Sequence, residues 1–395
     1  MRAGRVQAGG LALLRASWVA LAAGMLEMAQ TVGAVLPQGL SAMYLDVLNA
    51  TNCHDVCFGS FNGLTDPSLP VGQVLLSSTL NMSEAGYNPA SIDSGILTVS
   101  PDAVFSAIPD FEGGDPPVAA NLSNVVFMTP RDGSAVRIIK LHRGDGWPAK
   151  AMSNDLHIVH VNWDSSGNGQ LHALLQETGM ASGAGPSWGG YCTIDVATGA
   201  ADWVGAFPMH DIFLFVGAVS AFDPTSSTIY TTVLTRLGDE RVYSFTCCTN
   251  GAFAASTTWV VGGLARNASL AGLAVCPGKP PVAVVNPIDE QSTPAGASTG
   301  GPKVLQLLPD STTQTLYDFG PDMILFSASL GGTIGADDSV VILLDDSSPA
   351  TPPWQGDKAV LAIVPLDLES GPVRRLDVAP RMDADSFAGL VYDSP

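Results

Sequence analysis

The chain has 395 residues and a formal net charge of −20, with 17 Lys and Arg against 37 Asp and Glu. We find no basic stripe, and this excludes nucleic acid and anionic membrane surfaces as expected partners, because binding phosphates needs clustered Lys and Arg. Hydrophobic residues make up 46%, and the 42 glycines and 28 prolines follow no fixed period. This composition excludes collagen and predicts a large core with many turns between short strands.

The amino terminus has the pattern of a secretory signal peptide. Arg2 and Arg5 precede an apolar stretch whose longest uninterrupted part, residues 16–26, is about half the ~20 residues that a membrane helix needs. We expect cleavage after Ala34, with Gly24 as the other candidate, so that residues 1–34 are removed and 35–395 form one domain. The alternative is an uncleaved anchor in which Arg15 snorkels. No later run is long and apolar enough to span a bilayer.

Four acceptor sequences for N-glycosylation follow this segment, at Asn49, Asn81, Asn121 and Asn267. Such triplets also occur by chance, but after a signal peptide they predict a glycoprotein. The expected location is therefore secreted, extracellular or lumenal. We expect the protein to be a monomer.

The chain has six cysteines, which an exported protein tends to pair in disulfides: Cys53, Cys57, Cys192, Cys247, Cys248 and Cys276. Cys53 and Cys57 are close enough to close a short loop. Cys247 and Cys248 are adjacent, and we expect them to pair elsewhere, with Cys192 and Cys276 as available partners. A zinc site is the weaker alternative, because a second Cys or His pair at the usual spacing is missing.

Apolar strand patterns that end in a turn signal recur along the chain at intervals of 54 to 63 residues. Random loops would not be spaced so evenly, so the intervals indicate structural repeats. We call these segments the markers. They lie at residues 97–101, 159–164, 219–224, 272–277, 332–337 and 389–393.

A second pattern recurs within the repeats, at residues 191–199, 243–251 and 363–371. Each segment alternates apolar and polar residues and then turns at a small residue followed by glycine, which tolerates the positive φ of such a turn. This strand and turn pattern resembles that of YVTN-type and quinoprotein-like β-propellers over roughly residues 92–395. The resemblance implies an architecture of radially packed four-stranded sheets, and it implies no activity.

We therefore predict an all-β protein, a β-propeller. Strand-like segments at residues 42–48 and 71–78 could pair with the last marker and close the ring, which gives six blades. If Tyr44, Leu45 and Asp46 form a further marker, the number is seven. The rival architecture is a pair of β-sandwiches, but sandwich strands lack the longer period.

Several residue groups are candidates for chemistry. His157, His160 and His172 are close in sequence to Asp164 and Glu177, and cross-strand pairing could bring His160 towards His172. In a regular strand, however, His157 and His160 lie on opposite faces, which argues against a shared metal.

His210 and Asp211 form a candidate acid and base pair, although a turn explains them equally well. Ser187 and Ser298 lie in Gly-x-Ser-x-Gly sequences without the strand and helix of a nucleophile elbow. Asp337, Asp338, Asp383 and Asp385 are weak candidates for Ca²⁺ ligands, because no calcium loop sequence surrounds them.

The leading hypothesis is a binding or interaction module that recognises a protein, a glycan or a small molecule. The alternatives are a Ca²⁺-dependent hydrolase of the six-bladed lactonase type, proposed by analogy of fold alone, and a structural protein of the extracellular matrix or wall. The sequence offers no convincing catalytic set, and this favours the binding module.

Overall fold

The computed structural model describes the strands and turns of the repeats. The described residues are 40–46, 55–62, 73–81, 96–107, 124–132, 134–149, 156–164, 169–177, 188–223, 225–237, 240–249, 251–260, 268–275, 279–287, 301–320, 323–324, 333–335, 339–346, 358–366, 372–377 and 387–392. Within these ranges no helix is long and apolar enough to cross a membrane. The signal peptide prediction falls outside them.

The described elements are all strands, as predicted, and neighbouring strands pair mainly in antiparallel order. One sheet joins the two ends of the chain, because the last strand pairs with the first. Its order is β26 (Phe387–Tyr392), β1 (Leu40–Asp46), β2 (Asp55–Asn62) and β3 (Gln73–Asn81). The next sheet is β4 (Ile96–Val99), β5 (Ala103–Ala107), β6 (Val125–Pro130) and β7 (Arg137–Lys140).

A nine-stranded sheet holds the middle of the chain and contains two four-stranded meanders. The first is β9 (Leu156–Asp164), β10 (Gln170–Glu177), β11 (Gly189–Ile194) and β12 (Ala200–Ala206), and the short strand β8 (His142–Arg143) pairs with β12. The second is β13 (Ile212–Asp223), β14 (Thr228–Thr235), β15 (Glu240–Thr249) and β16 (Ala252–Val260). A single parallel contact between Ala206 and Ala252 joins them.

Two further sheets complete the described strands. One is β17 (Ala268–Ala274), β18 (Val282–Pro287), β19 (Lys303–Leu307) and β20 (Thr313–Asp318). The other is β21 (Met323–Ile324), β22 (Thr333–Gly335), β23 (Ser339–Asp346), β24 (Lys358–Pro365) and β25 (Arg374–Asp377).

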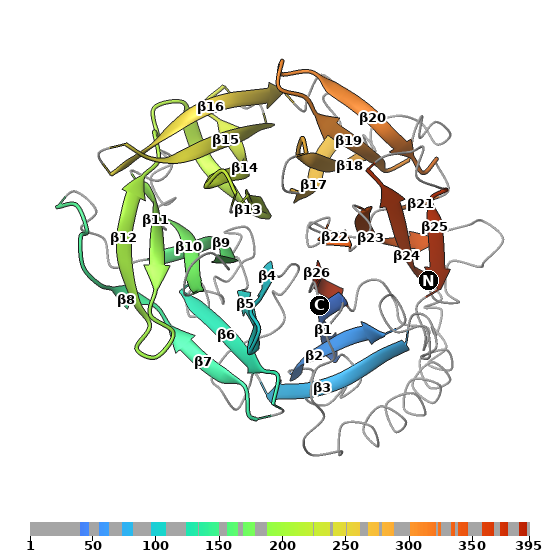
Figure 1. The fold of residues 1–395 in the computed structure, drawn as a ribbon, viewed down its shortest axis with the longest axis horizontal. Coiled ribbons are helices and arrows are strands. Elements are labelled where there is room, and N and C mark those ends of the chain that lie inside the picture. The colour runs from blue at the N-terminus through green and yellow to red at the C-terminus, as the bar shows by residue number, and fades with distance from the viewer. Residues whose placement is uncertain are drawn as a thin grey trace, which may run out of the picture.

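The sheets stand around a common centre, as in a β-propeller (Figure 1). The strands β4, β9, β13, β17, β22 and β26 lie innermost, and each contacts the next in the ring. The six predicted markers fall on these six strands. The sequence period therefore corresponds to one inner strand per sheet or meander.

Apolar side chains fill the spaces between neighbouring sheets. Phe105, Leu171 and Leu175 are buried between the β4–β7 sheet and the β9–β12 meander. Phe215 and Phe245 are buried on the other side of that meander, against β13–β16. Each described interface thus buries one apolar face of each of the two sheets that meet there, and neither sheet could bury that face alone.

The predicted turn glycines adopt the conformation that the pattern requires. Gly199 ends the β11 to β12 turn with a φ of 82°, and Gly251 ends the β15 to β16 turn with a φ of 73°. The two positions differ in their surroundings, because a Cβ at Gly199 would collide with the carbonyl oxygen of Lys140, whereas nothing lies within 4 Å of one at Gly251.

This pair gives a test of the fold. We expect Gly251→Ala to lower the free energy of unfolding by about 1 kcal/mol, the cost of alanine at positive φ. Gly199→Ala should cost at least about 1 kcal/mol more, because the Lys140 carbonyl must also move. Urea denaturation of both variants measures the difference. Equal losses would contradict the contact between the β11 to β12 turn and β7.

Candidate functional site

Polar side chains gather on one face of the β9–β10–β11 strands, the face that packs against β13. Strand β9 carries a bulge, because the register passes from Ile158 opposite Leu175 to His160 opposite Leu174. His157 pairs with Gln176, two residues along β10 from Leu174. His157 and His160 therefore lie on the same face, and the prediction of opposite faces was wrong, because a bulge adds one residue to the alternation.

Asn162, His172 and Tyr191 belong to this face as well. Asn162 pairs with His172 across β9 and β10, and Leu174 pairs with Tyr191 across β10 and β11. We call His157, His160, Asn162, His172 and Tyr191 the histidine face. His160 and His172 thus come close through cross-strand pairing, as the sequence suggested.

Few contacts tie the histidine face together. The Tyr191 hydroxyl donates to Asn162 Oδ1 over 2.6 Å. The His172 ring stacks on the Tyr191 ring with 5.1 Å between centroids, and on Phe222 of β13 with 6.4 Å. Beside this face, the Phe215 backbone N–H of β13 donates to Gln176 Oε1 over 3.2 Å.

Three nitrogen atoms of the histidine face have no hydrogen-bond partner and are buried: His160 Nδ1, Asn162 Nδ2 and His172 Nδ1. Buried polar atoms are normally paired, since an unpaired one costs the free energy of its lost hydration. The residues run from half-buried His172 to His160 and Asn162, which are 8% and 6% exposed. The face therefore offers unused hydrogen bonds on β9 and on the neighbouring β10.

Burial also determines the charge of the histidines. It lowers the pKa of His157 and of His160 to about 4. Burial lowers the pKa of His172 too, although the nearby carboxylate of Asp164 opposes this shift. All three rings are therefore neutral at pH 7, and the pKa of the Tyr191 hydroxyl is raised by the same burial.

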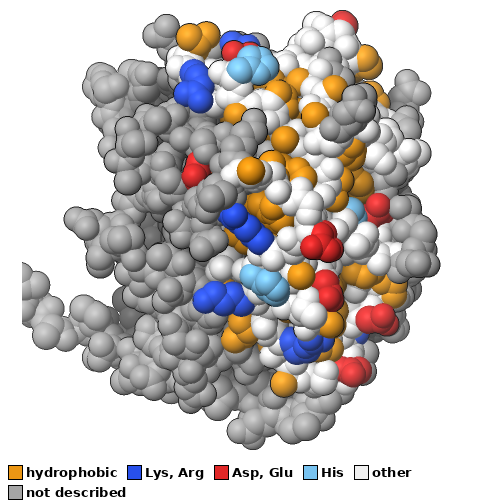
Figure 2. All heavy atoms as spheres, turned by 90° about the vertical axis from the view of Figure 1, so that its left-hand side faces the viewer, with side chains coloured by type: hydrophobic (Ala, Val, Ile, Leu, Met, Phe, Trp, Pro, Cys, Tyr) orange, Lys and Arg blue, Asp and Glu red, His pale blue; other side chains and the backbone are white. Residues whose placement is uncertain are grey.

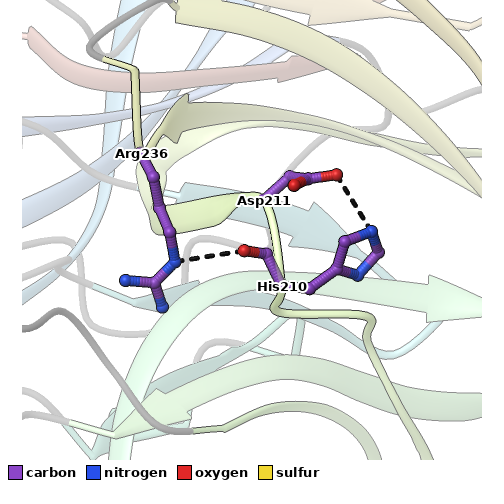
Figure 3. Close-up of polar contacts among 3 residues, drawn as sticks. All are labelled: His210, Asp211 and Arg236. Carbon is purple, nitrogen blue, oxygen red and sulfur yellow. Dashed lines mark hydrogen bonds and ion pairs between the residues drawn. The ribbon is translucent and has the colours of Figure 1, made fainter.

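The acid and base candidate at the start of β13 has a different character (Figure 3). His210 Nε2 lies 2.9 Å from Asp211 Oδ2, and the two side chains are 75% and 69% exposed. Arg236 Nε donates to the His210 carbonyl over 3.2 Å. An exposed pair of this kind contributes little stability, and the turn it occupies is held by the backbone bond from Arg236 to Asp211.

The cysteines depart from the expectation that Cys247 and Cys248 pair elsewhere. The structure joins these two residues to each other, and Cys192 is a buried free thiol. Cys192 packs into the cluster against β4–β7, whereas Cys247 packs against the cluster on the opposite side of the meander. Cys53 and Cys276 lie outside the described residues, and for Cys57 the description covers the backbone only.

Other predicted residues cannot be placed. Asp337, Asp338, Asp383, Asp385, Ser187 and Ser298 lie outside the described residues, as do Asn49, Asn121 and Asn267. Asn81 ends β3, and nothing describes its side chain. In the ranges that are described, no group of three or more His, Cys, Asp or Glu side chains could hold a metal ion.

No protein family and no curated protein matches the sequence. Solved structures with a similar fold are β-propellers. A periplasmic gluconolactonase from Pseudomonas aeruginosa has 10% identity and a TM-score of 0.43, over 90% of this chain and 99% of that one. An exo-β-1,3-galactanase from Phanerochaete chrysosporium has 11% identity and a TM-score of 0.40, over 74% and 62%.

The WD40 domain of SCAP from fission yeast has 9% identity and a TM-score of 0.37, over 84% of this chain and 64% of that one. These three proteins have unrelated functions by their names. The site must therefore be interpreted from its own residues.

The pKa values predict how stability depends on pH. An unfolded histidine has a pKa near 6.5, so the unfolded chain binds protons before His157 and His160 of the folded protein do. The free energy of unfolding is therefore highest above about pH 6.5. As the pH falls towards 4, it should decrease by about 3 kcal/mol for each of the two residues. Urea denaturation between pH 7 and pH 4 measures this loss.

His160→Gln places a side chain that cannot titrate at this position, so it should reduce the change in the free energy of unfolding between pH 7 and pH 4. The matched control is His142→Gln, which replaces an exposed histidine in the same way. If the two variants show the same slope as the unsubstituted protein, His160 is not buried as described.

Proposed function

We propose that this protein is a secreted, N-glycosylated β-propeller of six blades that acts as a binding module, with its ligand at the histidine face. The six-blade count is supported by the three four-stranded sheets, the five-stranded sheet and the two meanders of the nine-stranded sheet. Pairing of β26 with β1 supports closure through the two ends of the chain.

The observation that carries the proposal is the set of unpaired nitrogen atoms on the innermost strand β9 and its neighbour β10. His160 Nδ1, Asn162 Nδ2 and His172 Nδ1 need partners that the described protein atoms do not supply. A ligand that brings such partners gains hydrogen bonds in surroundings of low polarity, where they are strong. The neighbouring rings of Tyr191 and Phe222 provide apolar contact.

The chemistry of the face favours an uncharged ligand. The histidines are neutral at pH 7, so they cannot balance an anion, and Asp164 lies close enough to influence His172. Amide, imidazole and phenol groups together suit a molecule rich in hydroxyl and carbonyl groups. We therefore propose a neutral saccharide as the ligand class.

The test is a titration with neutral sugars. Glucose, galactose, mannose, cellobiose and lactose are added to the secreted protein, and binding is followed by ligand-observed NMR and calorimetry. We expect at least one of these sugars to bind, and Asn162→Leu to weaken it about tenfold, the value of one or two lost hydrogen bonds. Binding by none of them, or unchanged binding by Asn162→Leu, would contradict the proposal.

Two controls accompany this titration. His142→Gln changes an exposed histidine of β8 and should leave the affinity unchanged. Thermal unfolding with and without a chelator addresses the Ca²⁺-dependent alternative, since a binding module of this kind should keep its melting temperature. A fall in the melting temperature with chelator would support the hydrolase hypothesis instead.

A further inference from the structure

A second group of unpaired polar atoms lies at the outer edge of the β9–β12 meander, beside β12 and at the opposite end of the meander from β9. Here the chain leaves β7 and runs beside β12. The backbone N–H groups of His142 and Gly144 donate to the carbonyls of Gly199 and Ala201 over 3.0 and 2.9 Å. Trp147 Nε1 donates to the Ala201 carbonyl over 2.6 Å. This short segment is therefore held firmly on β12.

The register places Arg143 on the apolar side of β12. Arg143 pairs with Ala201, which is fully buried in the cluster between this meander and β4–β7. Paired residues of neighbouring strands share a face, so the Arg143 side chain enters the edge of that cluster. The adjacent Asp202 alternates to the other face, where its Oδ1 accepts the Asp145 N–H over 2.7 Å.

One aromatic ring, that of Trp147, lies against the guanidinium. The Arg143 Cζ lies 5.1 Å from the centre of the Trp147 ring, within the range of a cation–π contact. Trp147 packs in turn on Trp203 at 4.9 Å and on Trp188 at 5.4 Å between ring centres. The guanidinium thus contacts Trp147, whose ring is itself fixed by two further tryptophans.

The donors of this group are unused. Arg143 Nε and Nη2 are buried without a hydrogen-bond partner, and so is Trp188 Nε1. A guanidinium cannot lose its proton to escape the cost of burial, because its pKa exceeds about 12. Arg143 is half-buried as a residue, but this edge of its guanidinium is covered and unpaired, which is unfavourable, and an anion that pairs with the edge relieves the cost.

We propose that Arg143, with Trp147 and Trp188, forms a binding site for a carboxylate group. The Nε and Nη2 atoms lie on one edge of the planar guanidinium and match the two oxygen atoms of a carboxylate. This site is independent of the histidine face, which lies on the opposite side of the meander. Both nitrogen atoms are covered by protein atoms, so binding as we propose it requires the Arg143 side chain to move away from the Trp147 ring.

Exposed basic side chains lie next to Arg143 in the sequence and on the surface. Arg137, Lys140 and His142 are exposed on β7 and β8, and among the described residues neither Arg137 nor Lys140 forms an ion pair. Figure 2 shows Lys, Arg and His side chains gathered on this side of the molecule, next to a band of Asp and Glu. The carboxylates of Asp145, Asp195 and Asp202 are exposed on the same segment and turn, so these basic side chains are part of a mixed surface and the selectivity for an anion rests on Arg143 itself.

The experiment titrates the secreted protein with sodium galacturonate and with an oligomer of galacturonate, in chloride-free buffer at constant ionic strength. Calorimetry measures affinity, and thermal unfolding measures stabilisation by the bound anion. We expect binding to the unsubstituted protein. Arg143→Lys keeps the charge but loses the planar edge, so its affinity should fall about tenfold or more. Binding of the oligomer alone would indicate a polysaccharide as the source of the carboxylate, and binding of the monomer would indicate a free acid.

Arg143→Met separates a binding role from a structural one. It removes the buried charge, so the melting temperature should stay equal or rise, while the response to galacturonate disappears. Lys140→Gln is the control and should change the affinity less than about threefold, since an exposed charge contributes little. Asn162→Leu should leave galacturonate binding unchanged. No binding by the unsubstituted protein, or an unchanged response in Arg143→Met, would overturn the proposal.

Discussion

Burial of sheet faces against neighbouring sheets is the constraint on which the structure depends. A four-stranded sheet alone exposes two faces, and the strands of this protein are apolar on both. The β9–β12 meander illustrates this, because Leu171 and Leu175 pack on one side while Leu174 packs on the other. Any polar group placed between sheets must therefore find a partner there or raise the free energy of the fold.

Unpaired atoms of this kind gather in two places of the described structure, besides single hydroxyl groups at Ser106, Thr129 and Thr232. The histidine face leaves His160, Asn162 and His172 with unused nitrogen atoms, and the outer edge leaves Arg143 with two unused donors. The two groups differ in charge, since the histidines are neutral when buried and the guanidinium remains a cation. This difference is the physical reason for proposing an uncharged ligand at one place and a carboxylate at the other.

The sequence predicted the architecture well, because strand period and turn chemistry are local properties. Each marker lies on an innermost strand, and the turn glycines Gly199 and Gly251 have positive φ. The prediction from sequence was wrong where one extra residue in β9 changes the alternation of side chains between the two faces of the strand. His157 and His160 share a face only because of the bulge opposite Leu174, and no glycine or proline signals that bulge.

The outer site was missed for a different reason. Buried Leu141 interrupts the sequence of Lys140, His142 and Arg143, so the segment does not resemble a basic run. Arg143 contacts Trp147, and the pairing of β8 with β12 brings Trp147 to Trp188 and Trp203. Long-range pairing of this kind is not visible in the sequence.

The central claim is that the histidine face is buried between β9 and β13 and is neutral. NMR of the protein with 15N-labelled histidine tests it most directly, because the ring nitrogen shifts report the protonation of each residue. We expect His157 and His160 to stay neutral down to about pH 4. If both rings took up protons near the ordinary pKa of about 6.5, they would be exposed to solvent, and the histidine face would not be buried between β9 and β13.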